Sequence, residues 1–130
     1  MRSFSLPKTG TELFVEQRDM ALPSNALRSQ AIQLAEELHQ KVSAALGESI
    51  RVILFGSHAR GEATDESDVD VLVVLPVLEK STLDTVLEIA WEVGFEAGKV
   101  ISVIPATSDE LELLSASPFF QAVQREGIPV

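Results

Sequence analysis

The stretch from Val52 to Leu75, VILFGSHARGEATDESDVDVLVVL, decides the fold because two apolar runs flank a polar turn. The first run, from Ile50 to Phe55, has one polar residue and is too short for a buried helix, so it predicts a strand. The second run, from Val69 to Leu75, is apolar on both faces beyond Asp70, as expected of a central strand covered on both sides. Pro76 should end this strand.

Helices are predicted on both sides of this stretch. Apolar residues recur at helical spacing from Ser24 to Leu46, and Gly47 follows as a stop signal. A second apolar stripe runs from Ser81 to Ala97, where Ser81 and Asp84 have the spacing of a capping box. Long helices therefore precede and follow the two strands.

The C-terminal third of the chain continues the alternation. Val100 to Ile104 is a third predicted strand, and Thr107 with Glu110 has the spacing of a capping box that opens a short helix. Ser117–Pro118 begins a last helix, which Gly127 ends. This order of elements favours an α/β fold with a small sheet of three to four strands flanked by helices.

Length and composition set the domain organisation. A chain of 130 residues with 45% hydrophobic residues can build one compact domain with its own core. We place this domain at residues 24–130. Residues 1–23 mix prolines and a glycine with scattered apolar side chains and show no sustained period, so they are interpreted as an N-terminal extension.

Charge and residue usage exclude several functional classes. Ten Lys and Arg against twenty Asp and Glu give a net charge of -10, which disfavours direct binding of nucleic acid. The absence of cysteine excludes disulfides, thiolate metal sites and a cysteine nucleophile. No apolar run approaches the roughly 20 residues of a membrane helix, and the start of the chain lacks the apolar core of a signal peptide. We therefore expect a soluble, cytoplasmic protein that does not bind membranes.

The polar turn between the first two strands has the features of a phosphate and metal site. Gly56 would let the backbone approach a ligand closely, and Ser57 offers a hydroxyl and an amide at the start of a short helical segment. Ten residues separate Ser57 from Asp68, and Asp68 and Asp70 then stand two positions apart, so their side chains leave the same face of a strand. Two carboxylates on a stiff element suit an oxygen-liganded divalent cation such as Mg²⁺.

Other polar residues of this segment have more than one interpretation. Either half of the pattern alone, an acid pair or a glycine–serine turn, is an ordinary surface feature, and it is their combination that favours a site. Arg60 could reach a phosphate or pair with a local acid. We expect His58 to be a surface side chain rather than a base, and Gly61 to close the turn. The acids between the two halves, Glu62, Asp65 and Glu66, are expected to be solvated.

On these residues the chain resembles the small prokaryotic nucleotidyltransferase (MNT) domains of the DNA polymerase β superfamily, the antitoxin type paired with HEPN toxins. The hallmark of that group is Gly-Ser, ten residues, and then Asp-x-Asp, which Gly56–Ser57, Asp68 and Asp70 match without a gap. The resemblance covers residues 24–130 and implies a nucleotidyltransferase fold with a small mixed sheet. It also implies that Asp68 and Asp70 hold Mg²⁺ and act in catalysis, and that Gly56, Ser57 and Arg60 bind the nucleotide.

The resemblance further implies a function. Members of this group transfer AMP from ATP to a hydroxyl of a HEPN ribonuclease toxin, typically a tyrosine, and so act as its antitoxin. The alternative is a weak or inactive nucleotidyltransferase-like module that neutralises its partner by binding. A homo- or hetero-oligomer is compatible with either function.

One position departs from the family pattern. Active members carry a third carboxylate on the third strand, but Val100 to Ile104 contains no acid and Ser102 takes that place. A hydroxyl is a poor substitute for a carboxylate as a ligand or a base, so slow transfer or none is expected. Glu96, Asp109 and Glu110 are the nearest acids, and none of them lies at a strand position.

Exposed aromatic positions bear on partners. Trp91 and Phe95 stand one helical turn apart, off the main apolar stripe, and we expect them to be buried under a terminus, with an interface anchor as the alternative. Phe119, Phe120 and Val123 indicate a C-terminal helix docked on the domain, with a partner groove as the alternative.

Overall fold

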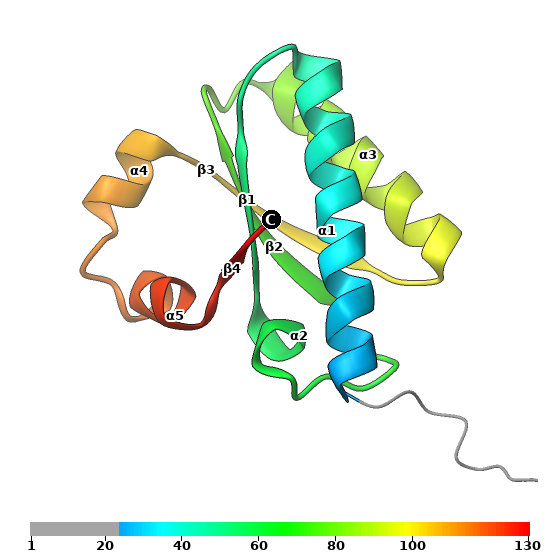
Figure 1. The fold of residues 1–130 in the computed structure, drawn as a ribbon. Helices are drawn as coiled ribbons and strands as arrows, with labels where there is room; N and C mark the ends of the chain where they lie inside the picture. Colours follow the sequence, from blue (N-terminus) through cyan, green and yellow to red (C-terminus); the bar gives the residue numbers. More distant parts are fainter. Residues whose placement is uncertain (1–23) are drawn as a thin grey trace, which may run out of the picture.

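The computed structural model describes residues 24–130, in which helices and strands alternate along the chain (Figure 1). The elements are α1 (Ser24–Leu46), β1 (Arg51–Phe55), α2 (Gly56–Arg60), β2 (Val69–Leu75), α3 (Lys80–Ala97), β3 (Ile101–Thr107), α4 (Ser108–Leu113), α5 (Pro118–Glu126) and β4 (Ile128–Pro129). The predicted extension over residues 1–23 lies outside the described residues.

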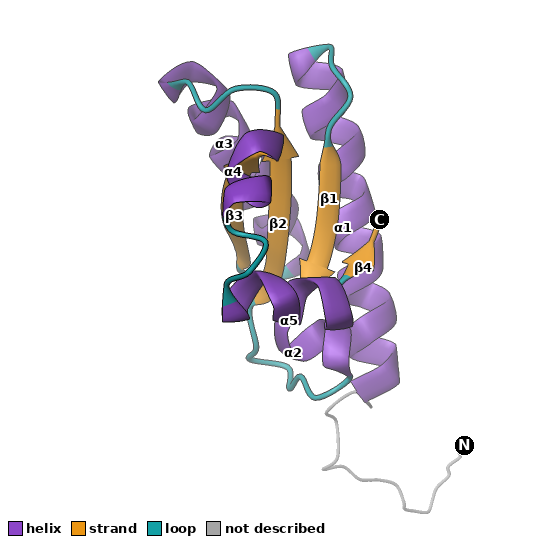
Figure 2. Cartoon of the chain, turned by 90° about the vertical axis from the view of Figure 1, so that its left-hand side faces the viewer, coloured by secondary structure: helices purple, strands orange, loops and turns teal. Residues whose placement is uncertain are grey.

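The strands form one mixed sheet in the order β3-β2-β1-β4 (Figure 2). The central strand β2 pairs antiparallel with β1 and parallel with β3. β4 adds a short antiparallel edge to β1, opposite Ile53 and Leu54. The α/β class and the small mixed sheet are confirmed.

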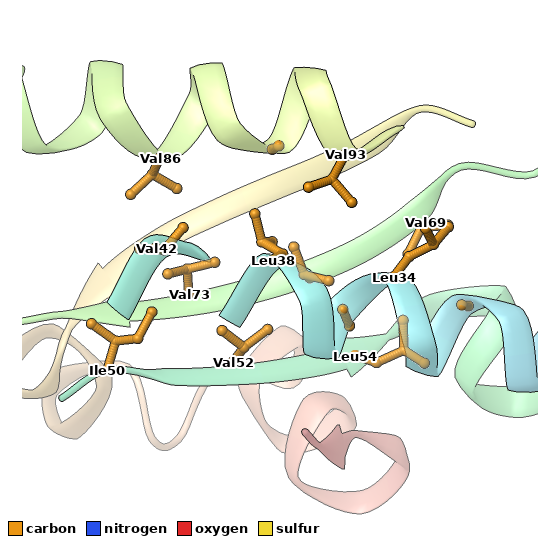
Figure 3. Close-up of a cluster of buried hydrophobic side chains, with 14 of the residues drawn as sticks. Leu34, Leu38, Val42, Ile50, Val52, Leu54, Val69, Val73, Val86 and Val93 are labelled. Atoms are coloured by element: carbon orange, nitrogen blue, oxygen red, sulfur yellow. The ribbon is translucent and has the colours of Figure 1, made fainter. Parts of the chain in front are cut away.

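Helices cover both faces of this sheet. α1 and α3 lie on one face, and α4 and α5 lie on the other (Figure 1). β2 serves both layers, because Val71 and Val73 are buried against α1 and α3, whereas Leu72 and Val74 are buried with Phe120 of α5 (Figure 3 shows the first cluster). The predicted apolarity of β2 on both faces is therefore confirmed. At about 25 cal/mol per Å² of buried apolar surface, these two clusters are the main favourable term of folding.

The helix starts follow the predicted capping residues in two of three cases. Thr107 and Glu110 form the full capping box of α4, with side chain to backbone distances of 3.2 and 3.0 Å. Ser117 caps α5 by accepting from the Phe120 amide at 3.1 Å. None of the helices between residues 24 and 130 is both long and apolar enough to cross a bilayer.

The start of α3 differs from the prediction. The helix begins at Lys80, so Ser81 lies inside its first turn and does not cap it. The carboxylate of Asp84, which a capping box would use, instead pairs with the Lys80 ammonium at 2.7 Å. The expected capping box at Ser81 is therefore wrong, because the carboxylate of Asp84 pairs with Lys80 instead.

The two aromatic expectations have different outcomes. Phe120 and Val123 are buried against the sheet, which confirms the docked C-terminal helix, although Phe119 stays half exposed. Trp91 and Phe95 are 65% and 67% exposed, so the expected burial is wrong for the part of the chain that the structure describes. The reason is that α3 turns its Val86, Ala90 and Val93 stripe toward the sheet, which leaves Trp91 and Phe95 on its outer side.

Candidate active site

Gly56 brings the polar turn against the central strand. β1 ends at Phe55, which is the register partner of Asp70, and Gly56 then turns the chain into α2 with a φ of +78°. A β-carbon built at position 56 would overlap the carboxylate of Asp70. Glycine is therefore required here twice, by the left-handed backbone and by the close approach of Asp70. The glycine–serine turn and the acid-bearing strand, ten residues apart in the sequence, are in direct contact.

Asp68 and Asp70 lie together at the start of β2. Val69 between them is 1% exposed and points into the core, so the strand alternation sends both acids to the other face. Burial raises the pKa of Asp70 above its ordinary value, and the neighbouring Asp68 carboxylate raises it further, while His58 and Arg60 act in the opposite direction. The predicted acid pair thus exists, with the Asp68 carboxylate close enough to disfavour the charge on Asp70.

This pair fits an oxygen-liganded divalent cation. Two close carboxylates, one of them partly desolvated, are stabilised when a cation is placed between them. Among residues 24–130 no cluster of three or more His, Cys, Asp or Glu side chains forms a closed cage. The protein would therefore supply Asp68 and Asp70, and the remaining ligands would come from a nucleotide's phosphate oxygens and water.

Ser57 and Arg60 stand on α2, beside the acid pair. Ser57 is half buried in the first turn, where its carbonyl accepts from the Glu62 amide at 2.9 Å. Arg60 pairs through Nε with Glu62 at 2.9 Å and through a terminal nitrogen with Glu126 at 3.5 Å. In the structure Arg60 pairs with local acids, which was one of its two interpretations from the sequence. Its role in binding phosphate stays a prediction. Gly61 ends α2 in the left-handed conformation, as expected.

His58 is not the surface residue that we expected. It is 1% exposed, because the single turn of α2 packs its inner side against α1 and the sheet. Its Nε2 lies 3.2 Å from the Ser67 carbonyl oxygen and donates to it, while Nδ1 is buried and has no hydrogen-bond partner among residues 24–130. Ser67 directly precedes Asp68, so His58 ties the acid-bearing loop to α2. The sequence gives little warning of this, because a histidine in a five-residue helix has no periodicity to place it.

Lys99 is a second residue of the site that sequence reasoning missed. Its ammonium donates to the Asp65 carbonyl oxygen at 2.8 Å, while the Val69 amide donates to the Val100 carbonyl at 2.9 Å. Both bonds fix the loop before Asp68 against the turn between α3 and β3. The only available signal was the position of a lone lysine at a helix end, beside a glycine.

Ser102 lies beside Asp70, on the strand where the resemblance predicts a third acid. The two residues are register partners in the parallel pair β2 and β3, so their side chains leave the same face of the sheet. β3 itself carries no acidic residue. Of the acids nearest in sequence, Glu110 is held in the capping box of α4, and Glu96 and Asp109 are exposed.

Comparison with known proteins agrees with this geometry. A family model described as a nucleotidyltransferase domain matches residues 32–123. Two proteins of Methanocaldococcus jannaschii are both named "putative protein adenylyltransferase". The first is 37% identical over 89 residues, which are 65% of this chain and 60% of that protein. The second is 40% identical over 77 residues, which are 59% of this chain and 73% of that protein. The chain thus spans about 60% of the first relative's length.

More distant proteins share smaller parts or the fold alone. A bifunctional uridylyltransferase/uridylyl-removing enzyme of Burkholderia mallei is 33% identical over 66 residues, which are 48% of this chain and 8% of the enzyme. A crystal structure described as a "putative nucleotidyltransferase" from Sulfolobus solfataricus superposes with a TM-score of 0.51 at 17% identity, covering 83% of this chain and 86% of that one. The family model spans most of the described residues, and in this chain the glycine–serine turn lies against the Asp-x-Asp strand. The chain therefore belongs to the nucleotidyltransferase domain family.

Proposed function

We propose that this chain is a Mg²⁺-dependent adenylyltransferase, which moves AMP from ATP to a hydroxyl of a partner protein. The observation that carries the proposal is the contact between Gly56 and the Asp70 carboxylate, because it sets a metal-binding acid pair against a turn that a triphosphate can approach. The names of the two archaeal relatives support AMP as the transferred group and a protein as its acceptor.

The residues of the site have separate roles in this reaction. Asp68 and Asp70 would hold the cation. When bound, this cation offsets the negative charge that builds up on the attacked α-phosphate and on the leaving pyrophosphate. Gly56 admits the terminal phosphates to the backbone, and the Ser57 hydroxyl donates to them. The acceptor oxygen forms a bond to the α-phosphorus, the bond from that phosphorus to the oxygen shared with the β-phosphorus breaks, pyrophosphate leaves, and the hydroxyl proton passes to solvent water.

Ser102 limits the rate that this site can reach. A serine hydroxyl does not accept a proton near neutral pH, so no side chain beside Asp70 on β3 activates the acceptor. A missing general base commonly costs about 10² to 10⁴ in rate. We therefore expect slow transfer.

The partner implied by the resemblance is a HEPN ribonuclease toxin, for which this chain would be the antitoxin. A net charge of -10 suits association with a basic, RNA-binding protein. The same charge, together with Ser102, favours a second candidate function, in which the chain silences the toxin by binding it without chemistry.

Labelled ATP distinguishes the two functions. The full chain is incubated with Mg²⁺, ATP labelled at the α-phosphate and the product of the neighbouring gene as the candidate toxin, and both label transfer and ribonuclease activity are measured. Adenylyl transfer predicts label on the toxin that is lost in Asp68→Ala and Asp70→Ala but kept in the matched control Glu66→Ala, an exposed acid of the same loop. Silencing that persists without label in Asp70→Ala supports the binding function. Absence of both label and silencing refutes the toxin as partner.

A further inference from the structure

An apolar groove lies between the outer side of α3 and the start of β3. It has a volume of about 310 Å³, and it is lined by Leu87, Trp91, Phe95, Lys99, Val100 and Ile101. The rings of Trp91 and Phe95 stack at a centroid distance of 4.9 Å and an interplanar angle of 14°. Single exposed apolar side chains are ordinary, but a stacked Trp–Phe pair in a continuous apolar hollow is typical of a protein interface. We call this feature the α3–β3 groove.

The groove lies at the same end of β2 and β3 as the acid pair, but on the other face of the sheet. Its residue Lys99 bonds the Asp65 carbonyl in the loop before Asp68, and Val100 accepts from the Val69 amide. The next residue, Ile101, is the register partner of Val69. The groove therefore ends one residue along the chain from the Asp70 and Ser102 positions, where α3 leads into β3 (Figure 1), but the side chains of Asp70 and Ser102 leave the opposite face of the sheet.

The surroundings of the groove are acidic. Glu88 and Glu92 are exposed, and each stands three residues before one of the two stacked rings, so helical geometry places them on the adjacent surface. The one positive side chain in the lining, Lys99, already donates to a backbone carbonyl. An apolar centre with an acidic rim is complementary to an apolar side chain flanked by Lys or Arg.

We propose that the α3–β3 groove is the docking site for the acceptor protein, which inserts an apolar side chain flanked by basic residues. This inference rests on the proposed function and adds to it the surface that selects the acceptor. Contacts made equally before and during the reaction raise the affinity for the acceptor without changing the chemical step. Because β3 is an edge strand, an acceptor docked in the groove would reach around this edge to bring its hydroxyl to the nucleotide at Asp70.

Kinetics of label transfer test the groove. The acceptor is the protein that the full chain labels with AMP or silences. Trp91→Ser and Phe95→Ser should raise the acceptor concentration for half-maximal labelling about tenfold or more, with the maximal rate and the KM for ATP within about twofold of the parent. The matched control is Leu113→Ser, since Leu113 is 84% exposed on α4 across the sheet. Unchanged half-saturation in both groove variants would overturn the docking site.

A binding measurement separates docking from chemistry. Trp91 is the sole tryptophan of the chain, so 5-fluorotryptophan gives one ¹⁹F resonance that reports on the groove. In the full-length Asp70→Ala variant, titration with the acceptor should shift this resonance, and addition of Phe95→Ser should abolish saturation. A resonance already shielded from solvent at every protein concentration means that residues 1–23 cover the groove. A resonance that shifts with the protein's own concentration means a second copy, and either result refutes the proposal.

The failure of the proposed function has a different signature. If the parent protein labels the acceptor and the groove variants label it with the same concentration dependence, only the docking site is wrong. If the parent neither labels nor silences any protein, the proposed function fails, and the acceptor site fails with it.

Discussion

Asp70 on β2 and Ser102 on β3 are register partners, so a carboxylate and a hydroxyl leave neighbouring parallel strands on the same face of the sheet. Substituting Ser102→Asp would place a third carboxylate beside the pair formed by Asp68 and Asp70. We expect transfer to become about 10- to 100-fold faster, because the new carboxylate can accept the proton of the attacking hydroxyl. Initial rates of AMP transfer measure this effect.

The control for this substitution is Ser102→Asn, because asparagine is similar in size to aspartate but carries no negative charge. It should leave the rate within about threefold of the parent. A Ser102→Asp variant that is no faster than Ser102→Asn would mean that position 102 is not where the missing base belongs.

Gly56 should be intolerant of any side chain. The alanine side chain in Gly56→Ala would be strained by the positive φ and would overlap the Asp70 carboxylate. We therefore expect the free energy of unfolding to fall by about 2–4 kcal/mol and ATP binding to be lost. Gly47→Ala is the matched control, since Gly47 has a φ of +67° but open space around its α-carbon. Gly47→Ala should lose about 1 kcal/mol and keep ATP binding. Chemical denaturation and ATP titration separate the two, and equal losses in both variants would refute the close approach.

The raised pKa of Asp70 gives stability a pH dependence of known sign. Because the folded state holds the proton of Asp70 more tightly than the unfolded chain, stability falls as the pH rises from the ordinary value of 3.8 through the raised pKa. Asp70→Asn should therefore be more stable than the parent at pH 7, by about 1 kcal/mol or less given the partial exposure of the site. The gain should vanish below about pH 4. Thermal denaturation at both pH values checks this, and an Asn variant that is less stable at pH 7 contradicts it.

Binding of the cation should stabilise the fold through the acid pair. A ligand that binds only the folded state adds about 2.7 kcal/mol at a concentration of 100 Kd. Mg²⁺ with ATP should therefore raise the Tm of the parent and of Glu66→Ala, and EDTA should reverse the rise. Asp68→Ala and Asp70→Ala should show no rise, and an equal rise in either of them would place the cation elsewhere.

The features that could be predicted from the sequence are those set by a pattern within one segment of the chain. α1, β2 and the glycine–serine turn follow from patterns that a single chain segment carries, so they could be predicted. β4 could not, because two residues become a strand only when β1 offers Ile53 and Leu54 as partners. The burial of His58 depends on how one short turn packs between α1 and the sheet, which no periodicity encodes. In each of these failures, contacts between distant segments decide the outcome.

His58 should control the position of Asp68 through the carbonyl of Ser67. His58→Phe fills a similar volume but leaves that partly buried carbonyl oxygen without its donor, which costs about 1–3 kcal/mol. His58→Gln keeps a donor at the corresponding position and should recover part of the loss. We expect His58→Phe to weaken Mn²⁺ binding, a probe for the acid pair, and to speed hydrogen exchange at residues 62–68, with His58→Gln intermediate in both. If stability falls in His58→Phe while Mn²⁺ affinity and loop exchange stay at parent values, His58 is only a core residue and does not position the acid pair.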